Sequence, residues 1–453
     1  MNRRRFLGVL GAAPLAFSSR FALAKKAVQK TNVVVVGAGL AGLNAALHLL
    51  ENNVQVTLLE ARERIGGRAW TSRVWSDLPV DLGGSWIHGQ DKNPLVPLAK
   101  KAGASPVLFD YDSVQRYWAE GKELSQTEDT QLDRLIERLH TTLEQHEDQP
   151  ALKVAEVIKK LERNLSSNQQ RMLAYAVSSE IEHNWGSPPN ELSIAGYLEG
   201  DGFEGGDLLL PGQVGLLPEF LAKQIRQLGG VIRLGSAVNA LQFTNSGVAV
   251  KVGNTTIQAD HVVLTAPLGV LQAGSIGLPT LPHKWQQALQ ELRMGSLEKL
   301  VLRFPEVFWE NTNYTVQLPQ LVQAGRWVDT LNLHNFTKIP ALMLFNGGVE
   351  GRKTNDLDDT RLVKSAMTML RGIFPDAPNP IAAQRSRWGR DPFALGSYSF
   401  ATGANPANAR NALQEPLAGK IWLAGEHTSI RAPQSFHGAY LEGERVAKAI
   451  LKK

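Results

Sequence analysis

The sequence predicts an α/β fold in which a parallel sheet flanked by helices is joined to a second region of mixed helices and strands. Two observations carry this prediction. Residues 32–60 follow the pattern strand, glycine turn, helix, strand, and residues 230–265 contain five short apolar runs separated by Gly, Asn or polar residues. With 453 residues, 43% of them hydrophobic and 20% charged, the chain is long enough for two domains with a sizeable core.

The first predicted elements along the chain form a βαβ unit. Val33–Val36 is a β-branched run typical of a strand buried on both faces. Leu40–Leu50 has apolar residues at helical spacing, and Val54–Leu59 is the second strand. These three segments fit the strand–helix–strand arrangement of a parallel crossover.

The later elements follow from the same patterns. Residues 126–172 are polar, with mixed charges three and four apart, which predicts exposed helices. Leu297–Phe304 is a further strand, and Tyr440–Leu451 is a terminal helix. Short strands are expected at Val231–Leu234, Ala237–Phe243, Val248–Val252, Thr255–Gln258, His261–Thr265 and Lys420–Ala424.

Residues 1–24 differ from the rest of the chain. Arg3-Arg4-Arg5 precede a short apolar run from Phe6 to Phe17, and Ala22-Leu23-Ala24 supplies the small-x-small pattern of a signal-peptidase site. The opening residues resemble a twin-arginine export motif, with Asn2 where Ser or Thr is usual. The sequence therefore predicts a periplasmic protein exported in folded form, and a basic tail or single anchor helix is the alternative. No membrane span is expected after removal of the signal.

Charge and composition narrow the function classes. The formal charge of +5 arises largely from residues 1–24, which carry four arginines and no acid, so the remaining chain is nearly neutral. This balance gives no argument for a nucleic-acid partner. The chain has no cysteine, which excludes disulfides, thiolate catalysis and a cysteinyl link to a cofactor. Its ten histidines show no metal-ligand spacing, so no metal site is predicted.

A glycine-rich turn follows the first strand and opens the helix. In Gly37-Ala38-Gly39-Leu40-Ala41-Gly42, the first Gly permits the turn, the second lets a pyrophosphate approach the helix N-terminus, and the third permits close packing on the sheet. Glu60 ends the second strand eighteen residues later, where a carboxylate accepts hydrogen bonds from ribose hydroxyls. This spacing predicts a Rossmann-like dinucleotide site.

Two further glycine segments favour FAD over NAD. Ala61 and Arg62 lead into Gly66-Gly67-Arg68, whose arginine is suited to phosphate. Asp81-Leu82-Gly83-Gly84-Ser85-Trp86-Ile87-His88-Gly89 is a flexible backbone segment that can lie along an isoalloxazine ring.

These segments resemble the flavin amine oxidase family, which comprises monoamine oxidases, polyamine oxidases and lysine-specific histone demethylases. The resemblance covers nearly the whole chain from Asn32 to Leu451 and is closest to polyamine oxidases. It also rests on Ala266–Leu271, on Trp388–Pro392 with Gly396–Ser399, on Ala424–Ser429 and on His437–Tyr440.

The resemblance implies an FAD domain of the two-dinucleotide-binding type, formed by residues 30–105, 209–290 and 396–453, and an α+β substrate domain formed by residues 106–208 and 291–395. The FAD is expected to be non-covalent. The candidate cofactor residues are Gly37, Gly39, Leu40, Ala41, Gly42, Glu60, Ala61, Arg62, Gly67, Arg68, Gly83, Gly84, Ser85, Trp86, Val238, Pro267, Trp388, Gly425, Glu426 and Phe436.

The implied reaction moves a hydride from the carbon beside an amine nitrogen to flavin N5, after which the imine is hydrolysed and O2 takes the electrons as H2O2. Lys299 matches the family's lysine that holds a water against the flavin, and the alternative is an exposed strand lysine. His88 is the second catalytic candidate, because histidine can hydrogen-bond an uncharged substrate nitrogen near neutral pH. The alternative is a loop histidine satisfied by the backbone.

An acidic stretch favours a cationic substrate. Met172–Ala222 contains no Lys or Arg but eight carboxylates, which would attract a polyamine at a cleft mouth, whereas the alternative is a solvated surface. Glu182 and Glu204 are the substrate candidates by family alignment. Tyr398 and Ser435 complete this set, with Ser435 standing where some relatives have a tyrosine. Trp388, Tyr398 and Phe436 are candidate aromatic walls, with core packing favoured for Phe436.

Other functions remain open at this point. A monoamine or L-amino-acid oxidase is one alternative, and Arg303 or Arg326 would then clamp a substrate carboxylate. A flavin-bound protein without oxidase turnover is another. A histone demethylase is disfavoured by the export signal. The polyamine, the cleaved bond, the electron acceptor and the oligomeric state are not fixed by the sequence.

Overall fold

The computed structural model describes residues 31–321 and 326–453, so the expected export signal in residues 1–24 lies outside the described residues. A parallel five-stranded sheet contains the predicted βαβ unit. Its strand order is β21-β13-β1-β2-β9, formed by Ile421–Leu423, His261–Leu264, Asn32–Val36, Gln55–Leu59 and Val231–Arg233. Every pairing in this sheet is parallel, as expected from the crossover pattern.

Strand β1 is buried on both faces because helices and strands cover the sheet on each side. Val33 and Val35 belong to a core shared with α1 (Leu40–Glu51), α7 (Leu216–Gln227) and α14 (Phe436–Leu451). Val34 and Val36 belong to a second core on the opposite face. That core includes residues of β10 (Val238–Phe243), β11 (Val248–Val252), β12 (Thr255–Ala259), α8 (Leu268–Gln272), α9 (His283–Glu291) and α13 (Pro406–Gln414).

A six-stranded sheet forms the second region, in the order β19-β15-β18-β17-β16-β7. Its strands are Ala382–Arg385, Leu297–Arg303, Ala341–Gly347, Asp329–Asn332, Tyr314–Leu318 and Val114–Trp118. On β15, Leu300 and Leu302 pack with α12 (Asp359–Ile373), whereas Val301 belongs to another core. By strand alternation, Lys299 lies on the same face as Val301. Helices α3 (Gln126–Glu144), α4 (Val154–Glu162) and α5 (Ser167–Ala176) form a core with β16.

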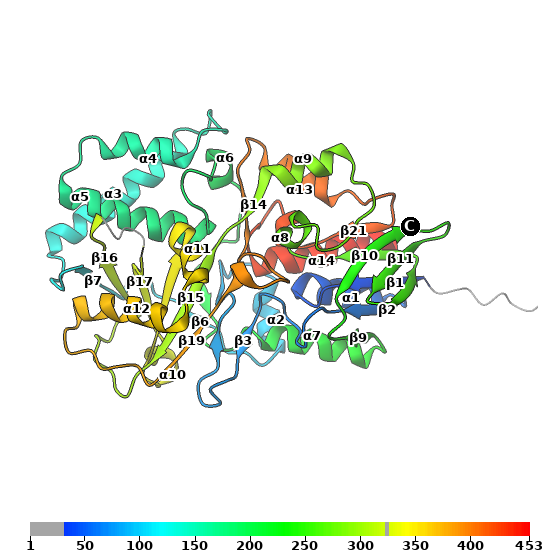
Figure 1. The fold of residues 1–453 in the computed structure, drawn as a ribbon, viewed down its shortest axis with the longest axis horizontal. Helices are drawn as coiled ribbons and strands as arrows, with labels where there is room; N and C mark the ends of the chain where they lie inside the picture. Colours follow the sequence, from blue (N-terminus) through cyan, green and yellow to red (C-terminus); the bar gives the residue numbers. More distant parts are fainter. Residues whose placement is uncertain (1–30, 322–325) are drawn as a thin grey trace, which may run out of the picture. The chain divides into compact units, whose positions relative to one another are not determined.

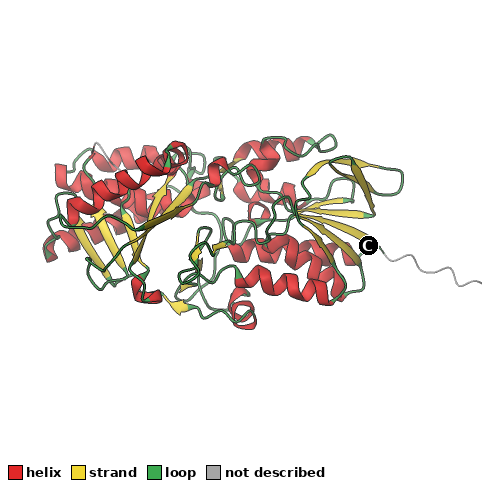
Figure 2. Cartoon of the chain, turned by 60° about the horizontal axis from the view of Figure 1, so that its bottom comes forward, coloured by secondary structure: helices red, strands yellow, loops and turns green. Residues whose placement is uncertain are grey.

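In Figure 1, β1, β2 and β21 lie on the right among α1, α7 and α14, and β7, β16 and β17 lie on the left with α3, α5 and α12. Figure 2 shows the same two groups of strands in yellow, each flanked by red helices. The five parallel strands come from residues 30–105, 209–290 and 396–453, and the six-stranded sheet comes from residues 106–208 and 291–395. The domain boundaries themselves stay a prediction.

The remaining elements are short. They are β3 (Thr71–Ser72), β4 (Val80–Asp81), β5 (Trp86–Ile87), α2 (Leu95–Lys101), β6 (Val107–Leu108), η1 (Val177–His183), α6 (Ile194–Tyr197), β8 (Leu208–Leu209), β14 (Leu292–Met294), α10 (His334–Thr337), α11 (Gly348–Asp356), η3 (Trp388–Arg390), β20 (Ser399–Ala401) and η4 (Glu426–Thr428).

The terminal helix begins earlier than the sequence predicted. It starts at Phe436 rather than Tyr440, because the Ser435 hydroxyl caps it by accepting a hydrogen bond from the Gly438 amide at 3.0 Å. The additional turn brings Phe436 to the helix N-terminus. Within residues 31–321 and 326–453, no helix is both long enough and apolar enough to cross a membrane.

Candidate active site

A cavity of about 1000 Å³ extends from the β1–α1 turn to the face of the six-stranded sheet that carries Lys299. Its volume is at the upper end of the range for ligand pockets. Of the predicted cofactor residues, those that line it are Gly37, Gly39, Leu40, Ala41, Glu60, Ala61, Arg62, Gly67, Arg68, Gly83, Gly84, Ser85, Trp86, Val238, Pro267, Trp388, Gly425, Glu426 and Phe436. Chain segments that lie far apart in the sequence therefore contribute to one site.

Gly42 is the predicted cofactor residue that does not line the cavity. A Cβ at this position would lie 2.0 Å from the Gly37 carbonyl oxygen and 3.1 Å from the Thr265 hydroxyl. Its absence of a side chain therefore serves the close packing of α1 on the turn, which is the role the motif assigns to the third glycine.

The β1–α1 turn is shaped to hold an anion. Gly37 has φ of +102°, a conformation that favours glycine, and its amide donates to Leu59 O at 2.7 Å. Gly39 is the N-cap of α1, and no side chain caps this helix end. The first amides of α1 therefore have no acceptor within the helix and lie at its positive end, beside the cavity. This arrangement fits the pyrophosphate of FAD.

The Glu60 carboxylate is held rigidly beside this turn. It is 3% exposed, and its two oxygens accept hydrogen bonds from the Ala38 amide at 2.8 Å and the Arg62 amide at 2.9 Å. Arg62 in turn pairs with Asp391 at 2.7 Å. A carboxylate oxygen has more than one acceptor site, so Glu60 can still accept from ribose hydroxyls at the cavity wall.

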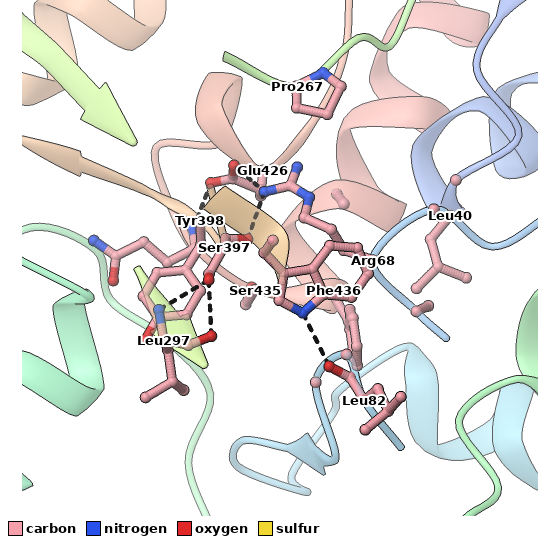
Figure 3. A pocket seen from close by; sticks show the side chains of 18 of the residues that line it. Leu40, Arg68, Leu82, Pro267, Leu297, Ser397, Tyr398, Glu426, Ser435 and Phe436 are labelled. Atoms are coloured by element: carbon pink, nitrogen blue, oxygen red, sulfur yellow. Dashed lines mark hydrogen bonds and ion pairs between the residues drawn. The ribbon is translucent and has the colours of Figure 1, made fainter. Parts of the chain in front are cut away.

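Arg68 and Glu426 lie farther along the cavity. The Arg68 Nη1 donates to Glu426 Oε1 and to Ser397 O, both at 2.9 Å, as Figure 3 shows. Burial alone would raise the pKa of Glu426, but the positive charges of Arg68 and Arg410 and hydrogen bonds such as that from Ser399 lower it to about 2. Arg68 was expected to bind phosphate directly. In this structure its guanidinium is shared with Glu426, so the pair presents little net charge.

Lys299 is buried, which rules out the interpretation as an exposed strand lysine. It is 4% exposed, lines the cavity, and donates through Nζ to Asp81 O at 3.0 Å, to Ser85 Oγ at 2.6 Å and to Gly83 O. The rings of Trp86 and Phe345 lie 5.8 Å from Nζ. Burial lowers the pKa of Lys299. The lysine is therefore anchored to the same glycine segment that was predicted to lie along the flavin.

Aromatic side chains border this part of the cavity. Trp388 Nε1 donates to Leu82 O at 2.9 Å and packs edge-on to Trp70 at 6.0 Å. Phe436 packs against the core formed by α1, α7 and α14 and also lines the cavity, and a Cβ on Gly84 would lie 2.5 Å from its ring. Tyr398 also lines the cavity, with its hydroxyl donating to His183 O. Ser435 lines the cavity beside Phe436.

His88 contacts a carboxylate rather than the backbone. Its Nδ1 lies 2.7 Å from Asp207 Oδ2, and 61% of its side chain is exposed at the cavity. Asp207 also accepts from the Gly89 amide at 2.8 Å and the Tyr111 hydroxyl at 3.0 Å. Burial would raise the pKa of Asp207, but these hydrogen bonds and the His88 ring lower it.

The two glutamates expected at the substrate, Glu182 and Glu204, do not line the cavity. Glu182 is buried and accepts from the Val349 amide at 3.4 Å at the start of α11, and burial raises its pKa to about 7. Glu204 is exposed on a loop. Two other carboxylates of the same acidic stretch, Glu180 and Asp207, line the cavity. The composition of the stretch was informative, but it did not show which side chains face inward.

Sequence reasoning missed a His–Asp pair in the same cavity. His183 Nδ1 lies 2.8 Å from Asp329 Oδ2, and Tyr175 OH lies 3.3 Å from Asp329 Oδ1. All three residues line the cavity. His183 belongs to the acidic stretch, but Asp329 is far away in sequence, so no local pattern connects them.

Arg303 and Arg326, the candidate carboxylate clamps, lie outside the cavity. Arg303 pairs with Asp77 at 2.6 Å and Arg326 with Glu350 at 2.9 Å. Arg116 does line the cavity and pairs with Asp133 at 2.8 Å, and its buried Nε has no hydrogen-bond partner among the described residues.

In the described part of the chain, no cluster of His, Asp or Glu side chains is arranged to hold a metal ion.

Comparisons with known proteins agree with this geometry. The chain matches the family described as flavin containing amine oxidoreductase over residues 40–451. It is 31% identical over 439 residues to polyamine oxidase 2 of Arabidopsis thaliana, covering 92% of this chain and 87% of that protein. It is 32% identical over 439 residues to polyamine oxidase 3 of Oryza sativa subsp. japonica, covering 92% and 88%.

A third relative is longer than this chain. Lysine-specific histone demethylase 1 homolog 1 of Arabidopsis thaliana is 32% identical over 449 residues, which cover 94% of this chain and 52% of that protein. The chain therefore spans about half the length of this relative. The family match over residues 40–451 and the cavity agree on one assignment. The chain belongs to the flavin-containing amine oxidoreductases and is an FAD-dependent amine oxidase.

Proposed function

We propose that the enzyme oxidises a polyamine. The supporting observation is that four carboxylates, Asp112, Glu180, Asp207 and Asp329, line the part of the cavity formed by the substrate-side segments. The cationic side chains in this part are Arg116 and Lys299, and Arg116 already pairs with Asp133. A cavity with excess negative charge attracts and orients a substrate that carries several ammonium groups. Polyamine oxidases among the relatives support the same substrate class.

Bound FAD supplies the acceptor for the hydride that leaves the carbon beside the amine nitrogen. The protein must present that nitrogen uncharged, because only the free amine has the lone pair that forms the imine. The His88 ring, oriented by Asp207, is placed to hydrogen-bond an uncharged nitrogen and to hold a proton at the cavity. Lys299 holds the Gly83 backbone oxygen and the Ser85 hydroxyl at the cavity wall.

The imine is then hydrolysed to an aldehyde and an amine. We propose that O2 takes the two electrons and leaves as H2O2. A peroxide-coupled assay of the purified flavoprotein tests both statements, using spermine, spermidine, acetylated polyamines, putrescine, aromatic amines and L-amino acids as substrates. The proposal expects peroxide, with the highest kcat/KM for a polyamine. Highest efficiency with an aromatic amine would overturn the substrate class, and turnover only with an artificial electron acceptor would overturn the role of O2.

One observation favours a second candidate substrate. Arg116 lines the cavity and its Nε has no hydrogen-bond partner among the described residues, so its guanidinium is a candidate to bind a substrate carboxylate. An L-amino-acid oxidase would use such a group. The amino-acid arm of the same assay decides between the two, because Arg116→Met should abolish amino-acid oxidation but leave polyamine oxidation largely intact.

We also propose that residues 1–24 direct the folded enzyme to the periplasm through the twin-arginine pathway. The support is the order of Arg3-Arg4, the apolar run and Ala22-Leu23-Ala24 in the sequence. Cell fractionation and N-terminal sequencing test this. The protein should be found in the periplasm beginning at Lys25, and the double substitution Arg3→Lys, Arg4→Lys should retain it in the cytoplasm. Equal export of this variant would overturn the pathway.

A further inference from the structure

Asp81 is a buried carboxyl directly behind Lys299, and the proposed reaction gives its side chain no role. Its backbone oxygen accepts the Lys299 hydrogen bond at 3.0 Å, whereas its carboxyl has other partners. One carboxyl oxygen, Oδ1, accepts from the Thr71 hydroxyl and from the Val214 amide at 3.3 Å. The other, Oδ2, is buried without a hydrogen-bond partner among residues 31–321 and 326–453. A buried, partly unsatisfied carboxyl is costly and calls for an explanation.

Asp81 and Ser85 both line a second, small cavity. Its volume is about 10 Å³, and Gly212, Thr337 and apolar side chains also line it. A volume of roughly 10–15 Å³ is the minimum for a single water, which also needs two or more polar partners. The cavity meets both conditions. Ser85 is the link to the active site, because its Oγ lies 2.6 Å from Lys299 Nζ.

The two ionisable groups act chiefly on one another. Among the described residues, Lys299 is the charged side chain whose field lowers the pKa of Asp81, and Asp81 is the one that raises the pKa of Lys299. Burial acts in the opposite direction on both groups, raising the pKa of the carboxyl and lowering that of the amine. The neighbours of Lys299 on the cavity side, Trp86 and Phe345, do not titrate. The form with an ammonium and a carboxylate and the form with a neutral amine and a neutral carboxylic acid are therefore close in free energy.

We propose that Asp81 and Lys299 share one proton through Ser85 Oγ and a single water in the small cavity, so that Asp81 sets the charge that Lys299 presents to the active site. In the transfer, the Lys299 ammonium gives a proton through the hydroxyl and the water to the Asp81 carboxylate. This yields a neutral amine and a neutral carboxylic acid, so the net charge of the pair is unchanged. Asp81 is thus a positioning residue that acts through Lys299.

The proposal rests on the location of Lys299 in the active-site cavity, not on the identity of the substrate. A negative result with polyamines would therefore leave it intact. The test measures the NMR signal of the Lys299 side chain in the FAD-loaded enzyme, labelled with 13C at lysine Cε. The Lys299 resonance is assigned by its loss in Lys299→Met. Its chemical shift as a function of pH reports the charge of the side chain without any turnover.

In the wild-type enzyme we expect the Lys299 resonance to titrate in two steps, because the protons of an interacting pair leave in two coupled steps. In Asp81→Asn a single step remains, and its midpoint moves down by about 1 pH unit or more, because the negative charge that favours the ammonium is lost. Ser85→Ala keeps both ionisable groups but removes the hydroxyl through which the proton passes. Proton exchange between Lys299 and Asp81 should then become slow enough to broaden the Lys299 resonance.

Glu298→Gln is the matched control. Glu298 is as buried as Asp81, but it accepts from the Ser386 hydroxyl and the Trp388 amide, and it does not act on Lys299. Its neutralisation should leave the Lys299 titration unchanged. The proposal is overturned if Asp81→Asn leaves the midpoint where it is, or if the wild-type curve has one step. The wild-type measurement keeps the test decisive even if Asp81→Asn fails to fold.

Discussion

Arg68 and Glu426 form an ion pair between two segments that are far apart in sequence, with Nη1 and Oε1 at 2.9 Å and side-chain exposures of 21% and 5%. Glu426 also accepts from the Ser399 hydroxyl at 2.7 Å and the Gln434 amide at 3.2 Å. The carboxylate therefore joins the Gly66–Arg68 segment to β20 and to the loop before α14. The Gly66–Arg68 segment and the loop before α14 both line the cofactor cavity.

Removal of one partner of this pair should destabilise the protein strongly. Arg68→Met leaves Glu426 buried without its cation, and we expect the free energy of unfolding to fall by about 3 kcal/mol, together with loss of bound FAD. Chemical denaturation and the flavin content of the purified protein measure both effects. The double variant Arg68→Met, Glu426→Gln should recover part of the stability, because no unpaired charge remains. Equal stability of the two variants would contradict this account.

The same pair predicts a specific dependence of stability on pH. The folded-state pKa of Glu426, about 2, is below its ordinary value of 4.5, so ionised Glu426 stabilises the fold above pH 4.5. This contribution is lost as the pH falls through the folded pKa. Between pH 4 and pH 3, the wild type should lose about 1 kcal/mol more than Glu426→Gln, as measured by denaturant unfolding. Parallel curves for the two proteins would show that Glu426 does not carry the effect.

Two glycines of the Gly37–Gly42 motif should respond differently to an added methyl group, one by weaker FAD binding and the other by lower stability. At Gly39 a Cβ meets no atom within 4 Å, and the backbone is extended, so Gly39→Ala should fold normally. The new methyl would occupy the place predicted for the pyrophosphate, so the Kd for FAD should rise at least about tenfold. At Gly42 the Cβ would collide with Gly37 O, so Gly42→Ala should lower the Tm of the FAD-free protein. Calorimetry with and without FAD separates the two effects.

The cofactor half of the site was predictable because its signals are local. Gly37, Gly39 and Glu60 lie within one βαβ unit, and the turn that requires these residue types is encoded by adjacent residues. The resemblance then supplied the separated segments around Arg68, Pro267 and Glu426. Local periodicity also gave the correct strand for Lys299, but burial of that strand face depends on packing against the Asp81–Ser85 segment, which no pattern within β15 shows.

The substrate half was only partly predictable because it depends on which face of a segment turns inward. The acidic stretch contains Glu180 and Glu182 two residues apart, and the structure places the first in the cavity and the second against α11. The partner of His183 comes from β17, nearly 150 residues later. Likewise, the carboxyl of Asp81 faces a cavity formed with β8 and the loop before α7. Such contacts between distant segments have no local signature.

Lys299→Met should retain FAD but lose most of its activity. The substitution preserves the length of the side chain, and we expect turnover to fall by roughly 10²–10⁴-fold if the amine takes part in proton movement at the cavity. Stopped-flow absorbance separates the reductive and oxidative half-reactions. Arg303→Met is the control on the same strand, because Arg303 pairs with Asp77 outside the cavity. Unchanged turnover of Lys299→Met would refute the catalytic role.

Polyamine recognition should depend on the cavity carboxylates and not on the overall acidity of residues 172–222. Asp207→Asn and Glu180→Gln each remove one charge that lines the cavity, and we expect each to raise KM for spermidine by about tenfold. The effect on a neutral-tailed monoamine should be smaller, because that substrate has no second ammonium group. Steady-state kinetics in low salt gives the comparison, since screening weakens such interactions.

Glu204→Gln provides the matched control for this prediction. It removes the same charge from the same acidic stretch, but Glu204 is exposed and does not line the cavity. Its KM for spermidine should therefore stay close to that of the wild type. If Glu204→Gln raised KM as much as Glu180→Gln and Asp207→Asn, the general field of the acidic surface would explain the attraction. A selective effect of the two cavity residues instead requires that the second ammonium group binds beside them.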